Sequence, residues 1–412
     1  MGTAIQPLNK VQIGREANGS KGTLVAATRL LHGTGTLREE QDFYRSPYPA
    51  GVRANVGGAG SITRKGFGLA WETELTAEEV LWSLLTGVRG QVTPTQATVT
   101  GTADAAVTTS STTLADSRAT LVVNGWVGAT ITCDSKTAVV VSNTATEFTV
   151  ASWTGGTPTT GSAWSVAGLG YTWVFTPELT TGIPTIDTAT LEAIRSDGST
   201  NHYYAEAGYG MTSGFDFEWA GNDAAKFKFD MFARARQTDT PTSSLVVYPS
   251  REVLVTPLLS VYLDTTWAGL GGTQLTGIVR SIKASHLTGF APNYNLEGRS
   301  DLDFAKHKVG ALTSKLSMVL ELDAVGAARW TAYRANSLQY VRLKSVGSTI
   351  AGSGGLAKTV QVDGAYRFTA PPAEQVDGEQ MLIACELESV YDDTGTKTLE
   401  FTTINAVAAA SL

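Results

Sequence analysis

Apolar and polar residues alternate along several stretches of the chain, most clearly in "GFDFEWAGNDAAKFKFDMFARAR", residues 214–236. Folding this run at Asn222 sets four pairs of residues directly opposite each other: Phe215 and Phe229, Phe217 and Phe227, Asp216 and Lys228, and Glu218 and Lys226. The pattern predicts a β-hairpin with an apolar face and a charged face of alternating sign. Whether the charged face meets solvent, a partner or a channel is open at this point.

Two stretches combine a strand pattern with a helical period that follows it. In the first, "LTAEEVLWSLLTG", residues 75–87, Thr76 and Glu79 match a capping box, and an apolar stripe comprises Val80, Leu81, Leu84 and Leu85. In the second, residues 313–336, alternating Leu316, Met318, Leu320 and Leu322 precede helical spacing at Ala327, Trp330 and Arg334. The pattern predicts a strand followed by a helix in each half of the chain.

The flanking segments extend this parallel. A long polar loop with scattered aromatics precedes each strand, at residues 36–60 and 289–311. Each half is then expected to close in a hairpin, the first at 214–236 and the second at 381–405, turning at residues 392–395. We interpret this layout as an architectural repeat of two tandem domains.

Residues 92–169 interrupt the repeat. They contain few charges and several short β-like runs separated by Asn, Gly and Pro, which is typical of a small independent β module. The expected organisation is therefore an N-terminal arm (1–21), a first domain in two pieces (22–91 and 170–240), an inserted β domain (92–169), a second domain (250–405) and a C-terminal tail (406–412).

Composition narrows the class of function. The formal net charge of −7 and the low charged fraction of 17% argue against a general nucleic-acid binder, although DNA can pass such a protein without sticking. No stretch approaches the length of a membrane span, and the N-terminus lacks a signal-peptide pattern. The two cysteines make neither a disulfide framework nor a zinc site, and Cys385 is expected to be a small buried residue.

Catalytic and cofactor patterns are missing from the sequence. No phosphate-binding loop or nucleophile elbow is complete, and close carboxylates occur only where turn residues are expected. The four histidines lack metal-ligand spacing and are expected on the surface or in loops: His32, His202, His286 and His307. We predict no enzyme activity, no metal and no cofactor.

The first long loop offers residues suited to self-association. Arginines and aromatics anchor many protein interfaces, and this loop is long for a mere connection. The candidates for contacts between subunits are Arg38, Phe43, Tyr44, Arg45, Tyr48 and Arg53. The alternative is that these aromatics fold back on their own domain.

Three stretches together resemble the tail tube (major tail) proteins of bacteriophages with long, non-contractile tails. They are "VQIGREANGSKGTLVAATRLLHGTGTL", "FGLAWETELTAEEVLWSLLTG" and "ESVYDDTGTKTLEFTTIN". Residues 113–164 of the insert resemble a small β module that recurs in phage structural proteins. The likeness covers most of the chain, and no catalytic signature accompanies it.

The resemblance implies a mainly β protein with two tandem tail-tube-type β-sandwich or half-barrel domains, each with a flanking helix, and a small inserted β domain. Family members form rings that stack into a tube, and their inner sheets join into one β-barrel. Two domains per chain imply a trimeric, pseudo-hexameric ring, with a hexameric ring as the alternative. Implied partners are further copies of the chain, the tape-measure protein, the tail terminator and distal tail proteins, and passing double-stranded DNA.

In such a tube the charged face of the first hairpin would line the lumen, with Asp216, Glu218, Lys226 and Lys228 as the candidates. The expected location is the virion tail, after synthesis and assembly in the bacterial cytoplasm and without membrane insertion. The competing hypothesis is a β-rich binder of carbohydrate or a host surface. In that case Trp126, Trp153 and Trp164 of the insert would stack on sugars, unless they fill its core.

Overall fold

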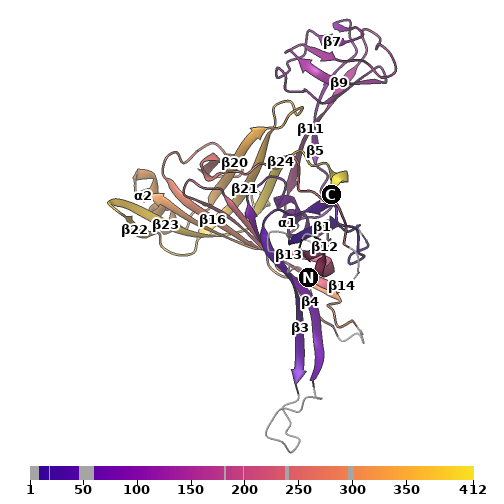
Figure 1. Ribbon diagram of the computed structural model, residues 1–412. Coiled ribbons are helices and arrows are strands. Elements are labelled where there is room, and N and C mark those ends of the chain that lie inside the picture. The colour runs from indigo at the N-terminus through magenta and orange to yellow at the C-terminus, as the bar shows by residue number, and fades with distance from the viewer. Residues whose placement is uncertain are drawn as a thin grey trace, which may run out of the picture.

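The structure is a computed structural model that describes residues 9–17, 19–45, 60–180, 182–197, 199–236, 241–295 and 301–412. Strands account for 52% of the chain and helices for 7%, which confirms the predicted mainly β class. The strands form a large antiparallel sheet that does not close into a barrel within one chain (Figure 1).

Eight strands form the main layer of this sheet, each antiparallel to its neighbours. Their order across the layer is β3 (Thr34–Arg45), β4 (Gly60–Glu74), β14 (Lys226–Arg236), β13 (Asn201–Ala220), β16 (Val279–Leu287), β19 (Thr313–Glu321), β23 (Gln380–Ser389) and β22 (Ala373–Asp377). The first four lie between residues 34 and 236 and the last four between residues 279 and 389.

The main layer consists of two units of four strands with the same order and directions. We call β3-β4-β14-β13 the N-terminal unit and β16-β19-β23-β22 the C-terminal unit. In each unit the second strand runs into a helix, α1 (Val80–Gly87) after β4 and α2 (Ala324–Arg334) after β19. The side chain of Thr76 accepts a hydrogen bond from the Glu79 N–H (3.1 Å), and Asp323 does the same for Gly326 (2.8 Å). The predicted strand–helix pairs are thus confirmed.

A second layer covers the apolar face of the first. It contains β15 (Leu259–Asp264), β20 (Gln339–Thr349), β21 (Ala357–Phe368), β24 (Leu399–Asn405) and the second half of β11 (Trp164–Phe175), in that order. The two layers meet where the Phe215 and Phe401 rings approach to 5.6 Å and where Trp219 Nε1 donates to Ser345 Oγ (3.0 Å). The first half of β13 bends away to pair with β12 (Ala189–Ser196), which pairs with β1 (Lys10–Arg15) and, through it, β2 (Arg29–Leu30).

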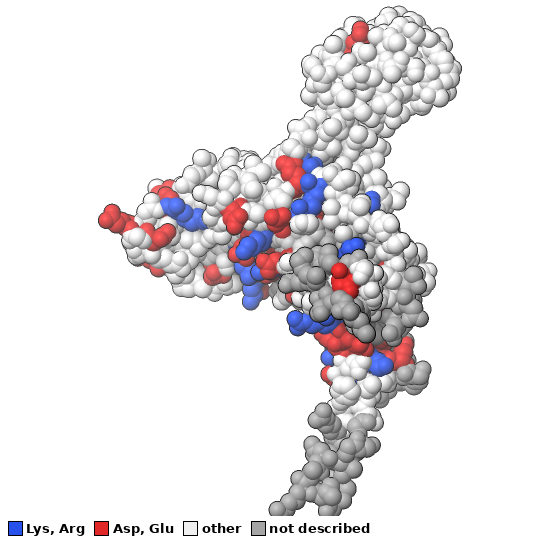
Figure 2. All heavy atoms as spheres, in the orientation of Figure 1, with Lys and Arg blue, Asp and Glu red and all other residues white. Residues whose placement is uncertain are grey.

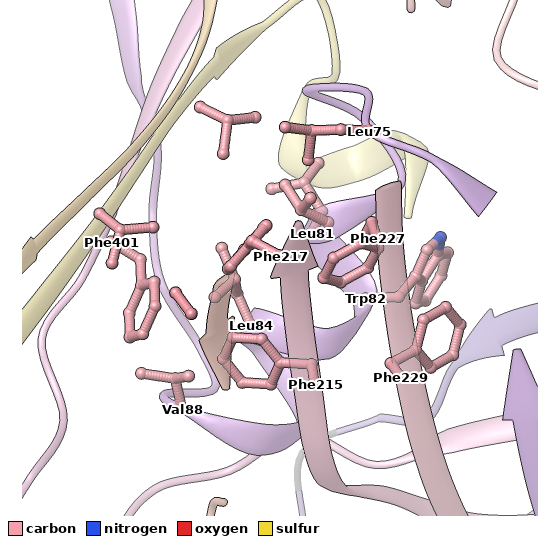
Figure 3. Packing of buried hydrophobic residues seen from close by; sticks show 14 of the residues in the cluster. Leu75, Leu81, Trp82, Leu84, Val88, Phe215, Phe217, Phe227, Phe229 and Phe401 are labelled. Atoms are coloured by element: carbon pink, nitrogen blue, oxygen red, sulfur yellow. The ribbon is translucent and has the colours of Figure 1, made fainter. Parts of the chain in front are cut away.

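The core lies between these layers and around α1. Every residue of α1 is buried, so the sequence-based stripe underestimates its burial. Leu81, Trp82, Leu84 and Val88 of α1 and its end pack against four phenylalanines of the β13–β14 hairpin: Phe215, Phe217, Phe227 and Phe229 (Figure 3). α2 differs, because Gly326 is its one fully buried residue.

A knob with a core of its own projects from this body (Figure 1). It spans residues 95–167 and contains β5 (Thr95–Gly101), β6 (Val107–Thr109), β7 (Thr113–Asp116), β8 (Thr130–Cys133), β9 (Lys136–Asn143), β10 (Glu147–Val150) and the first half of β11. Strands β5 and β11 form its neck. Two backbone hydrogen bonds tie it to the turn between β20 and β21, Leu169 N to Gly352 O and Gly354 N to Gly125 O (2.9 Å each).

The predicted closing hairpin at residues 381–405 is wrong. The turn is present, since Asp392 and Lys397 form an isolated bridge, but β23 and β24 both pair with β21 and belong to different layers. The hairpin that closes the C-terminal unit is β22–β23, which turns at Gly378. The sequence misled because "ACELES" and "LEFTTIN" both alternate, and alternation does not identify a strand's partner.

The two long segments that were predicted as loops, residues 36–60 and 289–311, both contain strands. Most of the described part of the first is strand, since β3 and β4 form a long hairpin that projects as an arm (Figure 1). The second contains a short hairpin, β17 (Phe290–Asn293) with β18 (Lys306–Val309), that packs on the N-terminal unit. There, the guanidinium of Arg234 lies 4.3 Å from the centre of the Tyr209 ring and 5.1 Å from that of Phe304. One-turn 3-10 helices occur at Thr256–Leu258 and Ala409–Ser411.

Candidate functional site

The register of the β13–β14 hairpin is the one predicted from its sequence. Phe215 pairs with Phe229, Phe217 with Phe227, Asp216 with Lys228 and Glu218 with Lys226. All four phenylalanines are buried, and the four charged side chains are half-buried or exposed on the other face. The prediction of one apolar and one charged face is confirmed.

The charged face extends far beyond this hairpin. Because directly opposed residues share a face, the pairing of the main layer defines two rows of side chains that run across the strands. The first row comprises Glu72, Lys228, Asp216, Ser285, Lys315, Glu388 and Arg367. The second comprises Glu74, Lys226, Glu218, Lys283, Ser317 and Glu386.

The sign of charge alternates along both rows, with one serine in each. The first row has three acids and three bases and so no net charge, while the second has three acids and two bases. Opposite charges directly across an antiparallel pair stabilise it, by about 0.2–1 kcal/mol each. A face built this way is strongly polar but exerts little net attraction on a distant phosphate.

Ion pairs connect neighbouring positions of the rows. Lys228 Nζ lies 3.2 Å from Glu72 Oε2, and Lys283 Nζ lies 3.5 Å from Asp216 Oδ2. The hydrogen bond and charge of Glu72 raise the pKa of Lys228, with smaller contributions from Glu218 and Asp216. Lys283 therefore connects the C-terminal unit to an acid of the N-terminal unit, across the β13–β16 junction.

Both outer edges of the main layer carry a strand that pairs on one side only among the described residues. β3 pairs with β4, and β22 pairs with β23. All five residues of β22 are exposed, including Val376 at 67%, whose side chain lies on the apolar face. An exposed strand edge with an apolar residue is a template for pairing with another chain.

The structure places the predicted loop anchors in different ways. Arg38, Phe43, Tyr44 and Arg45 lie on β3 itself, and Tyr48 and Arg53 lie outside the described residues. Phe43 and Tyr44 are 59% and 51% exposed on the arm, so they are not tucked against their own domain. Arg38 is exposed, and its Nε donates to Thr36 Oγ1 (2.9 Å).

The burial of individual side chains decides the predictions for the tryptophans of the insert, Cys385 and His286. The tryptophans Trp126, Trp153 and Trp164 are at most 8% exposed and belong to the core of the knob, so they do not form a platform for sugars. Cys385 is buried as predicted. The surface assignment of His286 is wrong, because its ring lies in the main core against Phe215, with 4.9 Å between ring centres.

Within the described ranges, no group of three or more His, Cys, Asp or Glu residues is arranged to hold a metal ion. Neither helix there is long and apolar enough to cross a bilayer. A hollow of about 500 Å³ forms an open depression on the charged face beside Gly214, Asp230 and Leu287. Burial, and then the charge of Asp216, raise the pKa of Asp230 at its edge.

Sequence reasoning missed most of the charged face. It identified Asp216, Glu218, Lys226 and Lys228, whose partners lie in the same hairpin. Their further neighbours Glu72, Lys283, Lys315 and Glu388 come from strands distant in sequence. The alternation in "SIKASHL" and "SKLSMVLE" was the available signal, but it gives no register between non-consecutive strands.

No protein-family model matches the chain, and a search of curated proteins finds no match to it.

Proposed function

We propose that the chain is a structural subunit that assembles edge to edge into rings and tubes, as the tail tube proteins of long-tailed phages do. The single observation that carries this proposal is the main layer: two like units joined at β13–β16, with a strand at each end that is paired on one side only among the described residues. A second copy can extend the layer as the second unit extends the first. Contacts of this head-to-tail kind close into a ring when the rotation between units is suitable.

The pairing of β13 with β16 inside one chain predicts how the edge strands β22 and β3 of neighbouring copies align. Thr76 and Asp323 each accept a hydrogen bond from the N–H three residues further on, and aligning them makes Glu74 equivalent to Glu321. Each of these two acids pairs with an arginine, Glu74 with Arg251 (2.8 Å) and Glu321 with Arg280 (3.0 Å). On this alignment β3 corresponds to β16 and β22 to β13.

The pairing of Glu218 with Lys283 and of Asp216 with Ser285 can then be transferred to the edges. The transfer sets Gln375 opposite Thr36 of the next copy, and Ala373 opposite Arg38. These pairs lie on the charged face, so they continue that face from one copy to the next.

The number of copies sets the number of strands in the ring, and the number of strands sets its diameter. Three copies contribute 24 strands, which at the usual spacing and tilt give a barrel of about 50 Å backbone diameter, whereas six copies give about twice that. Barrels of 16–18 strands already enclose a water-filled channel. We favour three copies, because three chains give six equivalent units.

The charged face would line the lumen of this ring. Its rows of alternating sign offer phosphates no continuous basic surface, so DNA would slide past instead of being held by counterion release. Under this proposal the lumen first holds a tape-measure protein and later conducts DNA, and the ends of the tube meet terminator and distal tail proteins. The location would be the virion tail.

A disulfide between copies tests the proposal directly. The variant Thr36→Cys with Gln375→Cys should form covalent oligomers on mild oxidation, because opposed residues of adjacent strands have Cβ atoms about 4.5–5.5 Å apart. Both native cysteines are buried, so they will not compete. Negative-stain microscopy should show rings or tubes, and the mass of an isolated ring should be three times 43.4 kDa.

The matched control is Glu39→Cys with Gln375→Cys, which places one thiol on the opposite face of β3. It should assemble without cross-linking. Protein that remains monomeric under all assembly conditions would contradict the proposed function. Rings that form without the Thr36–Gln375 cross-link would contradict only the register.

A further inference from the structure

A buried polar cluster lies where α1 begins, beside the segment that connects β14 to β15. It contains Glu78, Glu79, Trp82 and Ser83, together with Tyr248 of the segment that connects the units. Each of these residues is at most 2% exposed. Buried carboxyl groups are rare unless they are paired, so this cluster needs a physical explanation.

The cluster has few internal partners. Glu79 Oε1 accepts a long hydrogen bond from the His32 N–H (3.4 Å), and Glu78 Oε1 accepts one from Ser250 Oγ (3.1 Å). Within the described residues, three buried atoms have no hydrogen-bond partner, Glu78 Oε2, Glu79 Oε2 and Ser83 Oγ, while the Trp82 indole N–H faces the Tyr248 hydroxyl.

Three cations lie around the cluster, and two of them, Arg29 and Arg251, have a buried Nε without a hydrogen-bond partner among the described residues. Arg251 Nη2 pairs with Glu74, and the Arg29 guanidinium lies over the Tyr248 ring at 5.2 Å. On β21, Lys358 Nζ pairs with Glu252 at 3.2 Å. These residues, with His32, are the charged and titratable groups that face the cluster from β2, β4, β21 and the connecting segment.

Removal from water without an ionic partner disfavours the charged carboxylate. Burial raises the pKa of Glu79 to about 7, although Arg251 and the His32 N–H lower it and Glu78 raises it. Burial also raises the pKa of Glu78. Burial, and then the Glu79 charge, raise the pKa of Tyr248, which places Tyr248 and Glu79 in one electrostatic environment.

We propose that Glu79, with Glu78 beside it, holds a proton that fastens the connecting segment over the start of α1, and that losing this proton loosens this segment. The segment from residue 246 to 254 lies across the cluster and is held by the backbone of several elements. Leu254 N donates to Leu75 O (2.8 Å), Ala225 N to Leu254 O (3.1 Å) and Leu30 N to Val246 O (3.3 Å). Without the proton, Glu79 would be a second buried negative charge beside Glu78. Water that enters at this segment would solvate both charges most directly.

The sign of the effect follows from linkage. A carboxyl group with a raised pKa in the folded state binds its proton more tightly there than in the unfolded chain. Its stabilising contribution is therefore present at low pH and is lost as pH rises from about 4.5 to about 7. The equilibrium constant for unfolding should rise by on the order of 10²-fold from this group across that interval.

Hydrogen exchange on the full-length chain tests the inference. After correction for the intrinsic pH dependence of exchange, protection of residues 246–254 should fall at least about tenfold from pH 6 to pH 8.5. Glu79→Gln keeps a neutral side chain of the same shape and should show equal protection at both pH values. Glu147→Gln, in the knob, should respond like the native chain.

Infrared spectroscopy gives a second readout. At pH 6 the native chain should show the carbonyl band of a protonated carboxyl group, and Glu79→Gln should lack it. If Glu79→Gln does not fold, the band and the exchange response of the native chain decide alone. A pH response that persists in Glu79→Gln would overturn the inference. So would a native chain that shows neither the pH response nor the carbonyl band. The inference does not depend on ring formation, so it and the proposed function can fail separately.

Discussion

The two four-stranded units share an order of strands but differ in how they are built. The N-terminal unit has long strands, such as the 20 residues of β13, an aromatic core and a helix that is wholly buried. The C-terminal unit has shorter strands, a core face of aliphatic residues and cysteine, and a helix that is mostly exposed. The same topology thus occurs once with a large core and once with a small one.

This difference indicates a division of roles. The N-terminal unit contributes more of the core than the C-terminal unit does, and the C-terminal unit builds on it through β16, whose His286 enters the aromatic cluster of its neighbour. The thinner unit also provides the exposed edge strand β22. Stability and association therefore depend on different parts of one repeated design, and substitutions at matched positions can separate them.

The largest difference in the free energy of unfolding is expected between substitutions in α1 and in α2. Leu81→Ala empties a fully buried position on α1 and should lower the free energy of unfolding by about 2–5 kcal/mol. Val325→Ala on α2, where the side chain is 39% exposed, should change it by less than about 0.5 kcal/mol. Denaturant unfolding of both variants measures the contrast. Equal losses would show that the two helices contribute alike.

The junction should respond to acid through His286. Its imidazole is fully buried, neither ring nitrogen has a hydrogen-bond partner in the part of the chain that the structure describes, and burial lowers its pKa to about 3. Because the unfolded chain takes up this proton near pH 6.5, stability from this group is present above that pH and declines below it. We expect a loss of about 2 kcal/mol between pH 7.5 and pH 5.

His286→Phe removes the titrating group and keeps an aromatic ring against Phe215 and Phe401. Urea unfolding at several pH values should show a smaller decline below pH 6.5 than in the native chain. His32→Gln, at an exposed position where burial also lowers the pKa, serves as the comparison and should leave most of the decline in place. An unchanged acid response in His286→Phe would show that the junction is not its source.

The smallest effects are expected on the charged face. Lys228→Glu sets an acid between Glu72 and Asp216 and should cost about 1 kcal/mol, of which Glu72→Lys in the same chain should recover about 0.3–1 kcal/mol. Lys315→Glu with Glu388→Lys is the matched cycle in the C-terminal unit. A double-mutant cycle for each pair measures the coupling, and zero coupling at both would mean that the alternation has no role in stability.

Local patterns of the chain predicted local structure well. The strand–helix pairs and the register of residues 214–236 follow from alternation, caps and a turn, all of which act between residues close in sequence. The β22–β23 hairpin was missed because β22 is short and lacks an apolar face against its own core. The rows of the charged face and the buried position of His286 required the register between distant strands.

The knob enters the chain once, between α1 and β12, whereas the strand unit occurs twice. It carries few acidic or basic side chains on the face shown in Figure 2, where charge gathers on the body. In a wall assembled as proposed, the lumen would repeat with every unit, but the projections outside would repeat with every second one. Images of such a tube would then show a coarser periodicity on the outer surface than along the inner wall.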